Sequence, residues 1–550
     1  MPVRQYGIYI AYPPTVDLRA EGLGRHLAMF LKGAQALADI QFTIVCPSWS
    51  RQTLEVLFES ELLAPQFFKI MAPSKKPYAL RIFEAIRAHR SRPVRQRRFA
   101  RFYKWVANTN ARLWQRLTKR AVAVHDMASL LIFLAESVFL LALLTPVLCL
   151  ALPFAALLFF WRTLQLTANS LPVTFHRQWQ SLRSKAFAVL ASPQQENWVL
   201  RLYDEMHKYE MRRMQAIIAT LTDVRAWYCP TAFWPGFHDI KAPRLLCVPD
   251  VVLSDFPVAY SAIGDNRFLS TFEAVGRAIR AGEHFVTYSE TVKWNTLVDR
   301  YAVTAANVTV IPHAPNALNG HVEVLGFPDG EARSRLYCQS LLLGALQRSA
   351  NTSYCATFAN GEVKFLFYAS QFRPNKNVLM LLRSFEHLLR KAYLGHKLVL
   401  TGYPADMPEI GQFVREHRLV NDVIFLSGLS ISELAACYKL ADLAVNPSLS
   451  EGGCPFTFAE ALSVGTPVVM SRIAVTEEVL ADPQCQEVTL FDPFDWRDCA
   501  KRIQWAIKHR QHCLAIQRKI YDQLKERTWR HVVEEHVRVL DQISVDASGS

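Results

Sequence analysis

Short apolar runs rich in β-branched and aromatic residues alternate with longer segments of helical periodicity in two parts of this chain. The alternation is typical of βαβ units, which build parallel sheets. The strands predicted for the first part are Tyr6–Tyr12, Phe42–Cys46, Arg225–Cys229, Leu245–Val248, Phe285–Tyr288 and Val308–Ile311. Those predicted for the second part are Lys364–Tyr368, Lys397–Thr401, Val423–Leu426, Leu443–Asn446 and Pro467–Met470. The predicted fold class is therefore α/β, with two Rossmann-like sheets joined by a linker within 316–361.

An apolar segment interrupts the first alternation. Residues 127–161 contain one charged side chain, Glu136, and otherwise consist mainly of Leu, Phe, Ala and Val. As one straight helix this run would be about 52 Å long, which exceeds a hydrocarbon core of about 30 Å, whereas two full crossings need about 40 residues and a turn. We therefore expect a re-entrant or shallow helical hairpin bent near Pro146, with a buried helix pair of a soluble protein as the alternative.

Charge is concentrated beside that run. Residues 81–120 hold thirteen Lys and Arg against one acid, Glu84, so they account for +12 of the formal net charge of +14. Further cations follow the run from Arg162 to Lys185, which places both flanks on the cytoplasmic side. Cations that flank an apolar run favour an anionic inner leaflet over nucleic acid as the partner of residues 81–185. The expected location is the cytoplasmic face of the inner (plasma) membrane.

Other features of the chain exclude some classes. The eleven Cys are irregularly spaced without a CxxC pair, so we expect neither a metal cluster nor a disulfide framework. The first residues lack the pattern of a cleavable signal peptide.

The most informative motif follows the strand Leu443–Asn446. It reads strand, glycine loop, helix, glycine, strand, and the helix is predicted to begin at Pro455 and to end at Gly465. A small-residue loop that leads into a helix N-terminus at the carboxyl edge of a parallel sheet suits a diphosphate. Carboxylates beside such a site, here Glu451 and Glu460, are expected to accept hydrogen bonds from sugar and ribose hydroxyls. The loop and first helical turn comprise Gly452, Gly453, Cys454, Pro455, Phe456 and Thr457.

A second motif follows the strand Lys364–Tyr368. It supplies Arg373 and Lys376 before a helix, in the sequence Arg-Pro-Asn-Lys-Asn. Fixed cations at a strand end can neutralise a diphosphate leaving group without a metal. Alone the motif would also fit a solvated turn, but its pairing with the carboxylate loop favours a nucleotide-sugar site.

Together these motifs resemble glycosyltransferase family 4, the retaining enzymes of GT-B fold, over about residues 1–80 and 220–542. The resemblance implies that Glu460 binds the donor ribose, Glu451 the transferred sugar, and Arg373 and Lys376 the diphosphate. The Arg-Pro-x-Lys-Asn form is similar to that of several mannosyltransferases. Gly22 and Gly24 resemble the family's first glycine loop.

Two positions depart from the family pattern. Eight residues separate Glu451 from Glu460, where the family has seven, and we interpret the excess as a longer glycine loop. Pro249-Asp250 stands where many members have His-Asp. Asp250 is expected on the acceptor side, and His238 and His313 are candidates for the place of the missing histidine, although each also suits a structural role.

The strand pattern, the basic and apolar segment and the motifs together predict an acceptor-binding domain over 1–340, interrupted by a membrane insert over 80–215. They also predict a donor-binding domain over 341–525 and a closing helix over 526–543. The predicted function is retaining, metal-independent transfer of a sugar from a nucleotide-diphosphate sugar to a lipid-linked saccharide, in glycan or polysaccharide synthesis, with no cofactor and with mannose as one candidate. The alternative is a membrane-attached, non-catalytic nucleotide-sugar sensor or scaffold.

Overall fold

The computed structural model describes residues 3–14, 18, 22–61, 63–77, 80, 197–349, 358 and 363–549. The predicted basic and apolar segment, residues 81–185, lies outside the described residues, and so does the bend predicted at Pro146. Within the described ranges, no helix combines the length and the apolar character that a membrane crossing requires. The following description concerns the unit formed by Met1–Lys75 and Glu210–Ser550.

The first half of this unit is built on a seven-stranded sheet in the order β3-β2-β1-β4-β5-β6-β7. All of its paired strands run parallel, and β1 pairs with both β2 and β4. Strands from before residue 80 and after residue 220 therefore share one sheet, as predicted. The strands are β1 (Arg4–Tyr9), β2 (Ile40–Val45), β3 (Phe68–Met71), β4 (Val224–Cys229), β5 (Arg244–Cys247), β6 (His284–Thr287) and β7 (Val308–Val310).

The second half contains a six-stranded sheet in the order β10-β9-β8-β11-β12-β13, again parallel throughout. Every residue of its central strand β11 is buried, which is typical of a parallel strand covered on both faces. The strands are β8 (Lys364–Tyr368), β9 (His396–Leu400), β10 (Val423–Phe425), β11 (Leu443–Asn446), β12 (Val468–Ser471) and β13 (Leu490–Phe491).

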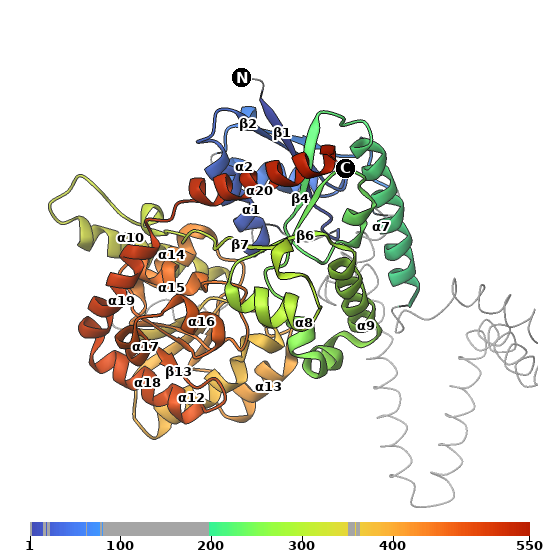
Figure 1. Ribbon diagram of the computed structural model, residues 1–550. Helices are drawn as coiled ribbons and strands as arrows, with labels where there is room; N and C mark the ends of the chain where they lie inside the picture. The colour runs from blue at the N-terminus through green and yellow to red at the C-terminus, as the bar shows by residue number, and fades with distance from the viewer. Residues whose placement is uncertain are drawn as a thin grey trace, which may run out of the picture. The chain divides into compact units, whose positions relative to one another are not determined.

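Helices connect the strands of both sheets (Figure 1). Those of the first half are α1 (Gly22–Ala34), α2 (Arg51–Ser60), α7 (Asn197–Ile218), α8 (Val252–Asp255), α9 (Pro257–Ala281) and the π-helix η5 (Val292–Val298). Those of the second half are α10 (Gly330–Arg348), α12 (Val378–Arg390), α13 (Pro408–Glu416), α14 (Ile431–Leu440), α15 (Phe456–Ser463), α16 (Ala474–Val479), α17 (Pro483–Thr489), α18 (Trp496–Lys508) and α19 (Arg510–Leu524).

The change from the first hydrophobic core to the second lies earlier than the predicted boundary at residue 340. Ala314 belongs to the first core and Leu318 to the second. Helix α10, which falls within the predicted linker, packs on α14, and its buried Cys338, Leu342 and Leu346 join the second core. The change of core thus lies at the start of the predicted linker range, and the boundary predicted at residue 340 is too late because α10 belongs to the second core.

The first half also resumes before the predicted end of the insert at residue 215. Glu210 is fully buried in α7 and accepts a hydrogen bond from the Ser48 backbone N–H at 2.6 Å. Met214, one turn later, belongs to the first hydrophobic core. The C-terminal part of α7 is therefore a structural element of the first half.

The last helix, α20 (Trp529–Gly549), returns to the first half, where it packs on α1 and β4 (Figure 1). Its residues Trp529, Val533 and Leu540 are buried in the first core. Gly33 of α1 permits this approach, because a Cβ at that position would lie 2.4 Å from the Trp529 carbonyl oxygen.

We predict that Gly33→Ala destabilises the protein by about 1–3 kcal/mol, because the added methyl group meets backbone that cannot move without shifting α20. Urea unfolding measures the effect. The matched control is Gly344→Ala in α10, where the nearest neighbour is the end of the Arg348 side chain at 3.7 Å. That control should be neutral or stabilising by up to about 1 kcal/mol. Equal effects of the two substitutions would contradict the packing described here.

Candidate functional site

The candidate site lies at the carboxyl ends of β8 and β11, which are neighbours in the second sheet. The segment after β8 forms a short 3₁₀ turn, η9 (Pro374–Lys376), and Asn377 then adopts the left-handed conformation with φ 51° before α12 begins. The segment after β11 runs alongside, and the Leu449 N–H donates to the Asn375 carbonyl oxygen at 2.8 Å. The topology of the sheet thus brings together the two motifs that the sequence places about 75 residues apart.

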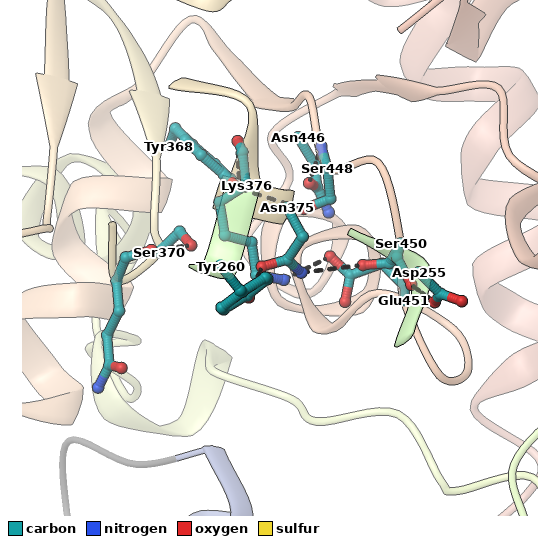
Figure 2. Close-up of polar contacts among 11 residues, drawn as sticks. Asp255, Tyr260, Tyr368, Ser370, Asn375, Lys376, Asn446, Ser448, Ser450 and Glu451 are labelled. Atoms are coloured by element: carbon teal, nitrogen blue, oxygen red, sulfur yellow. Dashed lines mark hydrogen bonds and ion pairs between the residues drawn. The ribbon is translucent and has the colours of Figure 1, made fainter. Parts of the chain in front are cut away.

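Lys376 and Glu451 form an ion pair at the centre of this site (Figure 2). Lys376 Nζ lies 2.7 Å from Glu451 Oε1, and both side chains are largely shielded from solvent. Burial disfavours the charge of Lys376, but the charges of Glu451 and Tyr368 and the hydrogen bond to Glu451 outweigh this effect and raise the pKa of Lys376. The lysine therefore stays cationic at the place where the sequence predicts a diphosphate.

Helix α15 begins at the predicted loop, one residue later than expected. Pro455 is the N-cap with φ −56°, and Phe456 is the first helical residue. Gly465 has a φ of +83°, which allows the chain to turn from the helix into β12. Because N–H groups at a helix start point along the axis away from the helix, those of Phe456 and Thr457 face the loop from Glu451 to Cys454.

The glycine loop is pressed against the first half of the molecule. A Cβ on Gly452 would lie 1.9 Å from the Pro249 carbonyl oxygen, and the Ser289 hydroxyl donates to the Gly452 carbonyl oxygen at 3.0 Å. A Cβ on Gly453 would lie 2.8 Å from Tyr288 Cβ and 3.3 Å from the His313 ring. Both positions therefore require glycine for close approach rather than for a left-handed backbone.

Asp250 follows Pro249 at this contact. Burial raises the pKa of Asp250 to about 6, and the neighbouring Glu451 adds to the increase, while Lys376 and Arg373 oppose it. The acceptor-side carboxylate that the sequence predicts is thus electrostatically coupled to the donor-side residues. An aspartate with a pKa of about 6 can change its protonation state near neutral pH.

Two side chains of the first half contact the loops after β8 and β11 directly. The Tyr260 hydroxyl in α9 donates to Asn375 Oδ1 at 2.7 Å, and the Ser450 hydroxyl donates to Asp255 Oδ2 at 3.1 Å (Figure 2). Arg300 pairs with the other oxygen of Asp255 at 2.5 Å. The residues beside Lys376 and beside Glu451 are therefore each anchored from the opposite half.

The remaining predicted residues have separate surroundings. Glu460 is buried in α15 and pairs with Arg25, which directly follows Gly24 in α1. Arg373 Nη2 donates to Gln371 Oε1 at 2.6 Å. Burial raises the pKa of the half-buried Cys454 thiol to about 12, so this thiol is neutral at physiological pH. A Cβ on Gly24 would lie 2.1 Å from the Leu18 carbonyl oxygen, whereas one on Gly22 would meet nothing within 4 Å.

Of the two candidate histidines, His313 lies at the site. Its ring contacts that of Phe456, with centroids 4.6 Å apart, and burial lowers the pKa of His313. His238 lies in a separate turn, Pro235–Asp239, beside Phe237. Within the described ranges, no group of three or more His, Cys, Asp and Glu side chains could hold a metal ion.

Sequence reasoning missed the residues that join the halves, namely Arg25, Asp255, Tyr260 and Ser450, as well as the role of Asn375. Asn375 lies inside a recognised motif and Arg25 directly follows Gly24, so a neighbouring motif in the sequence could have pointed to both residues. No sequence motif lies beside Tyr260 or Asp255 that could have done so.

The two parallel Rossmann-like sheets, with a site at the strand ends of the second and a final helix that returns to the first, define a GT-B fold. Residues 356–544 match the family described as glycosyl transferases group 1, and this part of the chain is a domain of that type. The chain is also 29% identical over 120 residues to O-antigen chain mannosyltransferase B of Escherichia coli. That alignment covers 22% of this chain and 31% of the relative, so it spans about a third of the relative's length.

Solved structures share the fold at low sequence identity. Alr3699/HepE of Anabaena in complex with UDP and glucose aligns over 98% of this chain and 100% of its own, with a TM-score of 0.52 at 11% identity. A glycosyltransferase of Rickettsia africae aligns over 99% of each chain with a TM-score of 0.51 at 9% identity. The N-terminal domain of trehalose-6-phosphate phosphatase of Candida albicans aligns over 99% of this chain and 97% of its own, with a TM-score of 0.54 at 10% identity.

We predict that Asp250→Asn stabilises the protein by about 1–2 kcal/mol at pH 7. Because the folded pKa of about 6 lies above the unfolded value, the carboxyl favours folding in its protonated form. That contribution is complete below about pH 4 and is lost as the pH rises through about 6. Urea unfolding at several pH values measures it.

The control for this pH dependence is Asp223→Asn, at an exposed aspartate in the turn before β4. The control should leave the pH dependence of the free energy of unfolding unchanged, while Asp250→Asn should flatten it between about pH 4 and 6. A loss of stability at neutral pH in Asp250→Asn would show that the ionised carboxylate is favoured in the folded protein.

Proposed function

We propose that this protein is a retaining, metal-independent glycosyltransferase that moves a sugar from a nucleotide-diphosphate sugar to a lipid-linked saccharide. The observation that carries the proposal is the Lys376–Glu451 ion pair, beside the loop that leads into α15. The pair provides a fixed cation for a diphosphate and a carboxylate for a sugar hydroxyl, and the start of α15 would add helical N–H groups for the diphosphate. The domain match at residues 356–544 supports the reaction class.

The donor side would act mainly through electrostatics. Lys376, Arg373 and the first turn of α15 would stabilise the negative charge that develops on the departing diphosphate. The C–O bond between the sugar and the diphosphate breaks, the acceptor oxygen forms the new bond to that carbon, and the acceptor proton passes to the leaving diphosphate. Glu451 would orient the transferred sugar, and Glu460 would accept hydrogen bonds from the ribose.

Asp250 would lie on the acceptor side of the transferred sugar. It belongs to the first half, contacts the glycine loop through its backbone, and is electrostatically coupled to Lys376 and Glu451. In its ionised form it can accept a hydrogen bond from the acceptor hydroxyl. We therefore assign it acceptor positioning in place of the family's missing histidine.

Mannose is the first sugar to test. The Arg373-Pro374-Asn375-Lys376-Asn377 motif resembles that of mannosyltransferases, and the curated relative is a mannosyltransferase by name. The basic and apolar segment between residues 81 and 185 would hold the protein at the cytoplasmic face of the plasma membrane, so that the search for a lipid-linked acceptor takes place in two dimensions. Synthesis of a cell-surface polysaccharide or glycan is the setting that fits this acceptor class.

The donor site is tested with membrane fractions and a panel of labelled nucleotide sugars, scored by label in the lipid extract. We expect label from one donor in the wild type and a loss of at least about 100-fold in Lys376→Ala, Arg373→Ala and Glu460→Ala, because each removes a preorganised group. The matched control is Lys397→Ala, which removes a lysine paired with Asp422 in the same sheet. Full activity in the three site variants would contradict the proposal.

An inactive wild type that still binds a nucleotide sugar would instead support the membrane-attached sensor or scaffold. Binding of the same nucleotide sugars, measured by calorimetry on the purified full-length chain, separates this outcome from loss of the site.

Membrane attachment is tested with vesicles that contain phosphatidylserine. We expect a weaker binding free energy, measured by co-sedimentation at low salt, when Arg95, Arg97, Arg98 and Arg101 are replaced by Gln. The loss should reach up to about 4 kcal/mol, at about 1 kcal/mol for each cation near the surface. The control replaces Arg497, Arg502, Arg518 and Arg538, which lie in the helices of the second half and in α20. Equal weakening by both sets, or none by the first, would contradict the assignment of the basic segment to the membrane.

A further inference from the structure

The carboxylate predicted to bind ribose is already paired with a residue of the opposite half. Arg25 Nη2 lies 2.6 Å from Glu460 Oε1, and only 4% of the Glu460 side chain is exposed. The Coulomb attraction of Glu460, followed by its hydrogen bond, raises the pKa of Arg25 despite the burial of the guanidinium. This ion pair, between a partly buried arginine and a buried glutamate, links the first turn of α1 to α15.

The position of Arg25 follows from the backbone before it. Gly24 approaches the Leu18 carbonyl oxygen so closely that any Cβ would clash with it, at 2.1 Å. Arg25 is the next residue. The glycine that the sequence assigns to the first glycine loop is therefore required for a close backbone approach directly before the residue that pairs with Glu460.

Other groups face this ion pair. Tyr438 of α14 interacts with both Glu460 and Arg25, and burial raises its pKa well above the ordinary value, so it adds no charge near neutral pH. Glu61 and His321 interact with Arg25 from the first and second halves. Arg510 of α19, the other helix packed on α15, donates to the carbonyl oxygens of Asp442 and Gly465.

Arg25 therefore provides the positive charge beside the Glu460 carboxylate. A carboxylate has two oxygens and about four acceptor positions, so one contact with a guanidinium leaves capacity for hydroxyl donors. Without a cation, a buried carboxylate becomes protonated at much higher pH than an exposed one, because burial penalises the charged form. A protonated carboxyl accepts hydrogen bonds from hydroxyls more weakly than a carboxylate does.

We propose that Arg25 is a positioning residue for donor recognition: it keeps Glu460 ionised and oriented, so that this carboxylate accepts hydrogen bonds from the ribose hydroxyls of the donor. The inference rests on the proposed function and adds a requirement that the donor site be completed by the first half of the chain. The opposite arrangement, in which the pair must break before the donor can bind, makes a different prediction about the same variants.

The test measures nucleotide-sugar affinity against pH on the full-length chain. The probes are UDP-glucose and GDP-mannose, and the 2′,3′-dideoxyribose form of whichever one binds. The variants are Arg25→Ala, Arg25→Lys and the double variant Arg25→Ala with Glu460→Gln. Isothermal calorimetry from about pH 6 to about pH 9 covers the range in which an unpaired buried carboxylate titrates.

In Arg25→Ala, we expect the affinity for the ribose probe to fall by up to about tenfold for each unit by which the pH is lowered through the range in which an unpaired buried carboxylate becomes protonated. The wild type and Arg25→Lys should show little change over the same range. This pH dependence of the affinity should disappear in the double variant, because the amide of Glu460→Gln does not titrate. It should also disappear with the dideoxyribose probe, which lacks the ribose hydroxyls. The control is Arg348→Ala, which removes the partner of the buried Glu433 in α14 and should leave the pH profile flat.

An unchanged, pH-independent affinity in Arg25→Ala would overturn the proposal, and so would tighter binding at every pH, which would identify the pair as a contact that competes with the donor. Persistence of the pH dependence in the double variant would also overturn it, because another group would then be titrating. If the wild type binds neither probe, the proposed function fails along with this inference. Binding by the wild type with a flat profile in Arg25→Ala rejects only the role of Arg25.

Discussion

The ion pair between Lys376 and Glu451, which is largely shielded from solvent, is the constraint on which the rest of the site depends. Two charges removed from water lose hydration free energy that their mutual attraction alone rarely restores, so additional hydrogen bonds must hold the surrounding groups. Here both side chains and backbone provide them: the Tyr368 hydroxyl contacts the Lys376 carbonyl oxygen and the Ser448 hydroxyl, and the Leu449 N–H donates to the Asn375 carbonyl oxygen. The two loops at the ends of β8 and β11 form one network as a result, and a diphosphate would exchange one anionic partner of Lys376 for another.

The same network depends on the first half of the chain. Gly452 touches the Pro249 carbonyl oxygen, Tyr260 binds Asn375, and Asp255 binds Ser450. Each contact is made beside a donor-side residue and comes from the segment around Asp250. A displacement of that segment would therefore alter both the acceptor side and the loops that carry Lys376 and Glu451.

Much of the fold could be predicted because the strands of a parallel sheet are short, apolar and separated by helices. The two sheets were expected, as was the joining of strands across the interruption. The edge strands β3 and β13 were missed, because β3 is only partly buried and β13 has two residues. Helix α10 was missed because only a narrow stripe of it is buried, at residues such as Cys338 and Leu342.

The two loops at the ends of β8 and β11 could likewise be singled out from sequence, because the residues that would suit a diphosphate are local: two glycines, a helix start and two nearby cations. Contacts between the two halves could not be predicted from the sequence. Tyr260 and Asp255 reach residues more than 100 positions away, and no periodicity records which distant loop a side chain will meet. The pairing of Glu460 with Arg25 is of the same kind, since it joins positions 435 apart in the chain.

The most direct test of this account is a crystal structure of the full-length protein with a bound nucleotide-diphosphate sugar. We predict the diphosphate at the start of α15, with its oxygens within hydrogen-bonding distance of Lys376 Nζ and the Thr457 N–H. The transferred sugar should lie between Glu451 and Asp250. A nucleotide bound away from the ends of β8 and β11, with the Lys376–Glu451 pair unaltered, would contradict it.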